Sequence, residues 1–115
     1  MAVIDVSWAS GKLARSCSSD SLGKREFGEA QWQVIKRRLA VLRAAPTVAD
    51  LVAVPGRFHV LTGDRAGCFA LDLRGPYRLI FSADHQPIPT LSDGGIDLSQ
   101  VNKVMIEEVV NYHGN

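Results

Sequence analysis

The spacing of the apolar residues changes near the middle of the chain, at Pro55 and Gly56. Before this point apolar side chains recur every three or four residues, which is the period of a helix with one buried side. After it they alternate with polar side chains, as in strands that bury one face. The first half therefore predicts helices and the second half strands joined by hairpins, an order typical of the α+β class.

The half before Pro55 predicts one strand followed by helices. Residues 2–8 are β-branched and roughly alternating, which favours a strand, and residues 9–17 allow a helical turn or two. The clearest helix comes after the polar residues 18–21, and its buried side is predicted to carry Phe27, Gln31, Val34, Ile35, Leu39, Leu42 and Ala45. Pro46 ends this helix, because proline disfavours helical geometry in the residue before it.

A second short helix is predicted over residues 47–54. Thr47 has the side chain of a helix N-cap, and its hydroxyl can accept a hydrogen bond from the amide of Asp50. The Asp50 carboxylate also suits the positive end of the helix dipole.

The half after Gly56 predicts three or four strands. A hairpin joins residues 58–61 to residues 68–74, and the next strand, over residues 77–81, places Arg78 on the face opposite Tyr77, Leu79 and Phe81. A long loop is predicted over residues 82–99. The β-branched content of residues 102–113 favours a final strand over a helix.

The length of 115 residues fits a single domain spanning residues 1–115. No apolar run is long enough to cross a bilayer, and residues 1–10 do not resemble a secretory signal, so a cytoplasmic protein without a membrane partner is expected. Cys17 and Cys68 are predicted to be reduced thiols.

Charge is distributed unevenly along the chain. Residues 12–78 hold twelve of the thirteen Lys and Arg residues against six acidic ones, whereas residues 79–115 hold one against five. The basic part could bind a polyanion, or it could be the solvated face of a helix, because four of its cations fall within residues 36–43.

Three segments together resemble the HigB-like branch of the RelE superfamily of toxins. The first is His59-x-Leu61-x-Gly63-Asp64-x-x-Gly67, the second is Tyr77-Arg78-Leu79-x-Phe81, and the third is Asn111-Tyr112-His113. Each motif is weak alone, and their order and spacing carry the likeness, which covers roughly residues 20–113.

The resemblance implies a fold and a function. The expected RelE-like fold has an N-terminal strand and two or three helices packed on one face of a mainly antiparallel sheet of four to five strands. The expected function is that of a ribosome-dependent mRNA endoribonuclease that uses no metal or other cofactor. Its expected partners are mRNA, the ribosome and a HigA-like helix-turn-helix antitoxin.

Cutting RNA without a metal requires activation of a 2′-hydroxyl, stabilisation of the phosphorane and protonation of the leaving oxygen. Histidine suits both proton transfers and arginine suits the charge stabilisation. We therefore assign the acid and base roles to His59 and His113, without deciding which is which, and phosphorane stabilisation to Arg78. Tyr112 is expected to orient or stack on a base. The residues expected to bind the substrate are Arg57, Arg65, Arg74 and Asn111.

Asn111 departs from the family's pattern, which has Asp before Tyr-His. An amide cannot take up a proton or raise a neighbour's pKa through negative charge. Two alternatives stay open: a ParE-like inhibitor of DNA gyrase on the same fold, and a decayed toxin that only binds its antitoxin.

Overall fold

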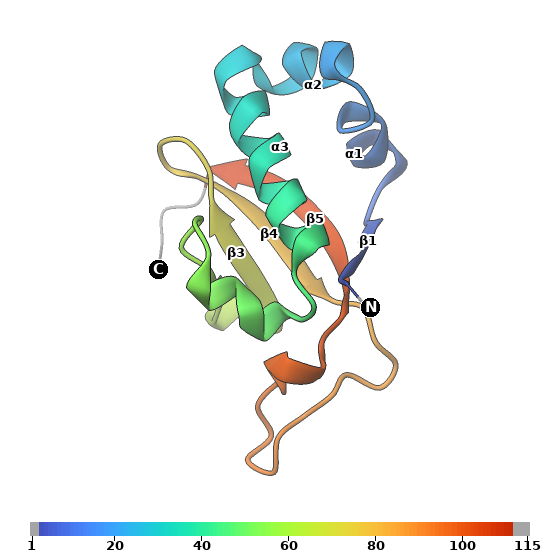
Figure 1. Cartoon of the computed structure of the whole chain (residues 1–115), viewed down its shortest axis with the longest axis vertical. Helices are drawn as coiled ribbons and strands as arrows, with labels where there is room; N and C mark the ends of the chain where they lie inside the picture. Colours follow the sequence, from blue (N-terminus) through green and yellow to red (C-terminus); the bar gives the residue numbers. More distant parts are fainter. Residues whose placement is uncertain (1–2, 112–115) are drawn as a thin grey trace.

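A computed structural model describes residues 3–111 of the chain (Figure 1). The helices are α1 (Gly11–Ser16), α2 (Asp20–Phe27) and α3 (Glu29–Ala44), and the 3-10 helices are η1 (Val48–Ala53), η2 (Gly63–Arg65) and η3 (Leu98–Gln100). The strands are β1 (Asp5–Trp8), β2 (His59–Val60), β3 (Cys68–Asp72), β4 (Tyr77–Ala83) and β5 (Lys103–Asn111). They form one sheet in the order β1-β5-β4-β3-β2, in which β1 and β5 are parallel and the other neighbours antiparallel.

The helices lie on one face of the sheet (Figure 1). The main core between α3, η1 and this face includes Trp32, Ile35, Leu42, Leu51, Phe69, Leu79, Phe81 and Ile106. On the opposite face, the strand residues Ala70 and Ile80 form a separate small cluster with Leu61, which follows β2. The α+β arrangement expected from the sequence is therefore confirmed.

The long helix predicted after residues 18–21 is broken in two. Gly28 has a φ of +82°, which ends α2 and begins α3, and this left-handed conformation suits a residue without a Cβ. Phe27 stacks on Trp32 across the break, with the ring centroids 6.3 Å apart. The apolar residues keep the same helical spacing across Gly28, so the sequence pattern does not reveal the break.

Other boundaries shift by a few residues. The short helix after Pro46 is the 3-10 helix η1, and the Asp50 carboxylate accepts hydrogen bonds from the Thr47 amide and hydroxyl, each at 3.0 Å. β3 ends at Asp72, and β4 runs to Ala83, into the predicted loop.

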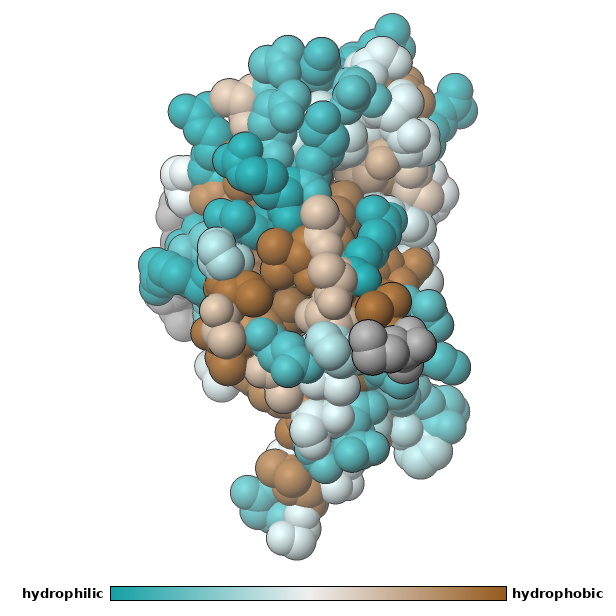
Figure 2. All heavy atoms as spheres, viewed as in Figure 1, coloured by the Kyte–Doolittle hydropathy of each residue, from teal (hydrophilic) through white to brown (hydrophobic). Residues whose placement is uncertain are grey.

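Figure 2 shows the face that carries the helices, with hydrophilic side chains over its upper part and apolar atoms gathered in its middle. Lys36 of α3 pairs with Asp20 at 2.9 Å, and Arg38 donates from Nε to the carbonyl oxygen of Asp72 at 2.7 Å. The cations of residues 36–43 thus belong to the helix layer. Within residues 3–111, no helix is long and apolar enough to cross a membrane.

Candidate active site on the open face of the sheet

The open face is the face of the sheet turned away from α3 and η1. Residues directly opposite each other on paired strands direct their side chains to the same face, so the register defines rows across it. One row contains His59, Ala70, Ile80 and Glu108, and the next contains Asp72, Arg78 and Val110. The pairing of β2, β3, β4 and β5 therefore brings His59 and Arg78, two predicted catalytic residues, to neighbouring rows of one surface.

His59 is half-buried in β2, and one of its ring nitrogens is already engaged. Its Nδ1 lies 2.6 Å from the carbonyl oxygen of Arg57. A carbonyl oxygen can only accept, so Nδ1 carries the proton in this contact and donates it. In the neutral ring Nε2 is then the basic nitrogen. This tautomer suits a histidine that accepts a proton from substrate.

Arg57, Asp72 and Arg78 form one charged cluster. Asp72 Oδ2 lies 3.1 Å from Nη1 of Arg57, and Asp72 Oδ1 lies 2.9 Å from Nε of Arg78. Nη1 of Arg78 also donates to the carbonyl oxygens of Tyr77 at 2.9 Å and of Gly75 at 3.2 Å. The guanidinium of Arg78 is thereby held against the turn between β3 and β4, with 18% of its side chain exposed.

A second ion pair joins Arg65, the last residue of η2 between β2 and β3, to Glu108 of β5. Beside it, the Ser82 hydroxyl donates to the Glu107 carboxylate at 2.6 Å. Cys68 is half-buried in the same region, and burial, followed by the nearby Glu107 carboxylate, raises the pKa of its thiol. Each of the three arginines Arg57, Arg65 and Arg78 thus has a carboxylate partner, and Arg57 and Arg78 share theirs.

The remaining predicted residues are placed less centrally. Arg74 is exposed in the β3–β4 turn, where its amide donates to Oε1 of Gln31 at 2.9 Å and its carbonyl accepts from Nε2 at 3.3 Å. Asn111 is exposed at the end of β5, opposite Tyr77. Tyr112 and His113 lie outside the described residues.

Sequence reasoning missed the carboxylates Asp72, Glu107 and Glu108. The alternation of β3 places Asp72 on the side of Ala70. Its role as a partner of two arginines appears only in the structure, where β3 pairs with β4 and Arg57 reaches the Asp72 carboxylate. Within residues 3–111, no three His, Cys, Asp or Glu side chains are grouped so that they could hold a metal ion.

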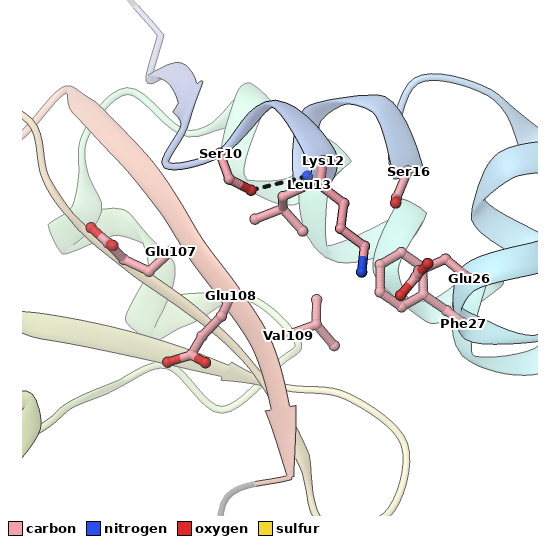
Figure 3. Close-up of a pocket in the computed structure, with 9 residues that line it drawn as sticks. All are labelled: Ser10, Lys12, Leu13, Ser16, Glu26, Phe27, Glu107, Glu108 and Val109. Atoms are coloured by element: carbon pink, nitrogen blue, oxygen red, sulfur yellow. Dashed lines mark hydrogen bonds between the residues drawn. The ribbon is translucent and has the colours of Figure 1, made fainter.

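A separate hollow of about 200 Å³ lies between β5 and the helices α1 and α2 (Figure 3). Leu13, Phe27 and Val109 contribute apolar side chains to its lining. Figure 3 shows Val109 directed toward the hollow, whereas the carboxylates of Glu107 and Glu108 point away from it. The hollow and the open face are therefore on different sides of β5.

No known protein family matches the sequence, and no curated protein matches it. Among solved structures, the chain is similar to one in the YoeB-YefM complex from Staphylococcus aureus, with 12% sequence identity and a TM-score of 0.56. The likeness covers 97% of this chain and 99% of the other. At this identity the likeness concerns the backbone arrangement, and it agrees with the element order and sheet described above. The chain has a RelE-like fold.

Proposed function

We propose that the whole chain is one domain that acts as the toxin of a type II toxin-antitoxin system, in the HigB-like branch of the RelE superfamily. Its activity is ribosome-dependent cleavage of mRNA in the cytoplasm, and its inhibitor is a HigA-like helix-turn-helix antitoxin. Two findings support this: the likeness to a chain of the YoeB-YefM complex extends over nearly the whole length, and the motif residues His59 and Arg78 share the open face.

The placement of His59 and Arg78 in neighbouring rows of the open face, on two strands separated by β3, is the observation on which the proposal mainly rests. His59, with Nε2 as its basic nitrogen, and His113 divide the proton transfers between them. Arg78 stabilises the charge on the phosphorane, because its guanidinium stays protonated and matches phosphate oxygens. Tyr112 stacks on a base, and Arg57, Arg65, Arg74 and Asn111 bind the substrate.

The ion pairs of the open face favour a second candidate, a chain that binds its antitoxin and no longer cuts RNA. Asp72 faces both Arg57 and Arg78, and Glu108 faces Arg65, so each of these arginines already has a carboxylate partner that competes with phosphate. This candidate predicts normal growth when the chain is expressed alone.

The test is induced expression without an antitoxin, followed by mapping of mRNA 5′ ends. The nuclease proposal expects growth arrest with new ends on translated messages, and loss of both in His59→Ala and Arg78→Ala. Asn111→Asp should maintain or increase cleavage. Arrest with intact messages and gyrase-linked DNA breaks would instead indicate a ParE-like activity, and normal growth the second candidate.

A further inference from the structure

Two guanidinium groups on the open face converge on one carboxylate. Asp72 exposes 17% of its side chain and Arg78 exposes 18%, whereas Arg57 exposes 79%. The cluster is therefore a half-buried ion pair with a second, solvent-facing cation on the outer oxygen of the same acid. Two cations around one anion leave one positive charge in excess.

The inner contact is close in distance and poor in hydrogen-bond geometry. Nε of Arg78 and Oδ1 of Asp72 are 2.9 Å apart, yet both atoms are buried and neither forms a hydrogen bond of acceptable geometry within residues 3–111. Charge-assisted bonds of arginine are strongest when they are well aligned and bidentate. An acceptor that forms a better-aligned hydrogen bond with Arg78 therefore binds this guanidinium more favourably than Asp72 does.

Arg57 links this cluster to His59. Its backbone has a φ of +49°, and in this conformation its carbonyl oxygen accepts the hydrogen bond from Nδ1 of His59 while its guanidinium reaches Asp72. The carboxylate thus occupies a position between two cations, one row away from the histidine. A phosphodiester carries the same charge and, like a carboxylate, presents two acceptor oxygens to a guanidinium.

We propose that Asp72 is an internal counter-anion in a phosphodiester-binding site formed by Arg57 and Arg78, and that it weakens the binding of an RNA backbone there. This rests on the proposed function in taking RNA as the ligand. The carboxylate keeps the two guanidinium groups in place in the free protein, and the RNA phosphate replaces it between them. Asp72 is a positioning residue, because it acts through the two arginines.

The test measures binding of a 12-nucleotide RNA with 2′-O-methyl riboses, which lacks the attacking hydroxyl and cannot be cut. At about 50 mM salt, Asp72→Asn should bind the oligomer about tenfold more tightly than the unchanged protein. The slope of log affinity against log salt concentration should be steeper by the amount that roughly one phosphate contact contributes. The matched control is Asp64→Asn, which removes one negative charge from an exposed position in the preceding turn and should change affinity less than twofold.

Adding Arg78→Ala to Asp72→Asn should abolish the tighter binding, because the gain requires the released guanidinium. Equal effects of Asp72→Asn and Asp64→Asn, or a gain that survives Arg78→Ala, would overturn the proposal. Because the oligomer is uncleavable, failure of the nuclease proposal in cells leaves this result unaffected, and the two outcomes are distinguishable.

A second measurement uses the unchanged protein, and it remains informative if Asp72→Asn unfolds. On addition of the same oligomer, the NMR signal of the Arg78 Nε–Hε group should shift as its partner changes. The corresponding signal of Arg38, which donates to the Asp72 carbonyl from the helix layer, should not shift. Binding that leaves the Arg78 signal in place would contradict the exchange.

Discussion

At the scale of single residues, Arg57 has the least usual backbone in the candidate site. Among the described residues other than glycine, it alone has a positive φ, at +49°. A side chain with a Cβ is strained in this region, at a cost on the order of 1 kcal/mol. Such strain is often found at functional sites, and here it accompanies the contacts of one residue with both His59 and Asp72.

Two substitutions at Arg57 separate the effect of its backbone strain from the effect of losing its charge. Arg57→Gly and Arg57→Ala both remove the guanidinium, but only glycine relaxes the left-handed conformation. We expect the free energy of unfolding, measured in urea, to be about 1 kcal/mol higher for Arg57→Gly than for Arg57→Ala. Equal stabilities, or a more stable alanine variant, would show that the positive φ carries no strain.

Cys17 should be an unreactive thiol. Burial raises its pKa from 9.0 to about 11, and the positive charge of Arg43 only partly opposes this shift. In Cys68→Ser, where Cys17 is the remaining thiol, iodoacetamide at pH 8 should react about a hundredfold more slowly with the folded protein than with the protein in urea. A ratio below tenfold would contradict the burial of this thiol.

The same shift gives a pH dependence of stability. Between pH 9 and 11 the folded protein keeps the Cys17 proton and the unfolded chain releases it, so the thiol stabilises the fold less as pH rises through this window. Cys17→Ser should remove this part of the alkaline loss of stability.

At the scale of elements, the contact between α2 and α3 depends on a glycine. A Cβ at Gly23 would lie 2.2 Å from Cδ2 of Trp32, a side chain that is 3% exposed. The indole is also held by α2 through a hydrogen bond, because its Nε1 donates to Asp20 at 2.8 Å. Hydrogen bonds from Lys36 and Trp32 also lower the pKa of Asp20.

Gly23→Ala should therefore destabilise the protein by about 1–3 kcal/mol through overpacking. Gly11→Ala is the matched control, since Gly11 begins α1 and has no neighbouring atom within 4 Å of its would-be Cβ. It should be neutral or slightly stabilising, because alanine favours helix. Thermal unfolding measures both, and a tolerated Gly23→Ala would mean that Trp32 can move aside.

The elements themselves could be predicted because each depends on local pattern. The strand of residues 77–81 was placed by the alternation of Tyr77, Leu79 and Phe81, and the final strand by β-branched content. The break at Gly28 was missed because the apolar period runs across it. The pairing of Asp72 with Arg57 and Arg78 could not be predicted, because it combines the register between β3 and β4 with a contact to residue 57, which lies outside this hairpin.

At the scale of the whole molecule, the uneven charge along the chain is divided between two layers. The cations of residues 36–43 lie in the helix layer, away from His59, whereas the open face combines arginines with Asp72, Glu107 and Glu108. Net charge along the sequence therefore did not locate the candidate site. The placement of His59 and Arg78 on the same face of the sheet did.

The central claim is that this open face cuts mRNA. The most direct measurement is 5′-end mapping of cellular mRNA after induction of the unchanged chain and of His59→Ala, both without an antitoxin and at matched protein levels. We expect new 5′ ends within translated messages for the unchanged chain, and their loss in His59→Ala. Intact messages in both strains, or the same ends in both, would contradict the account.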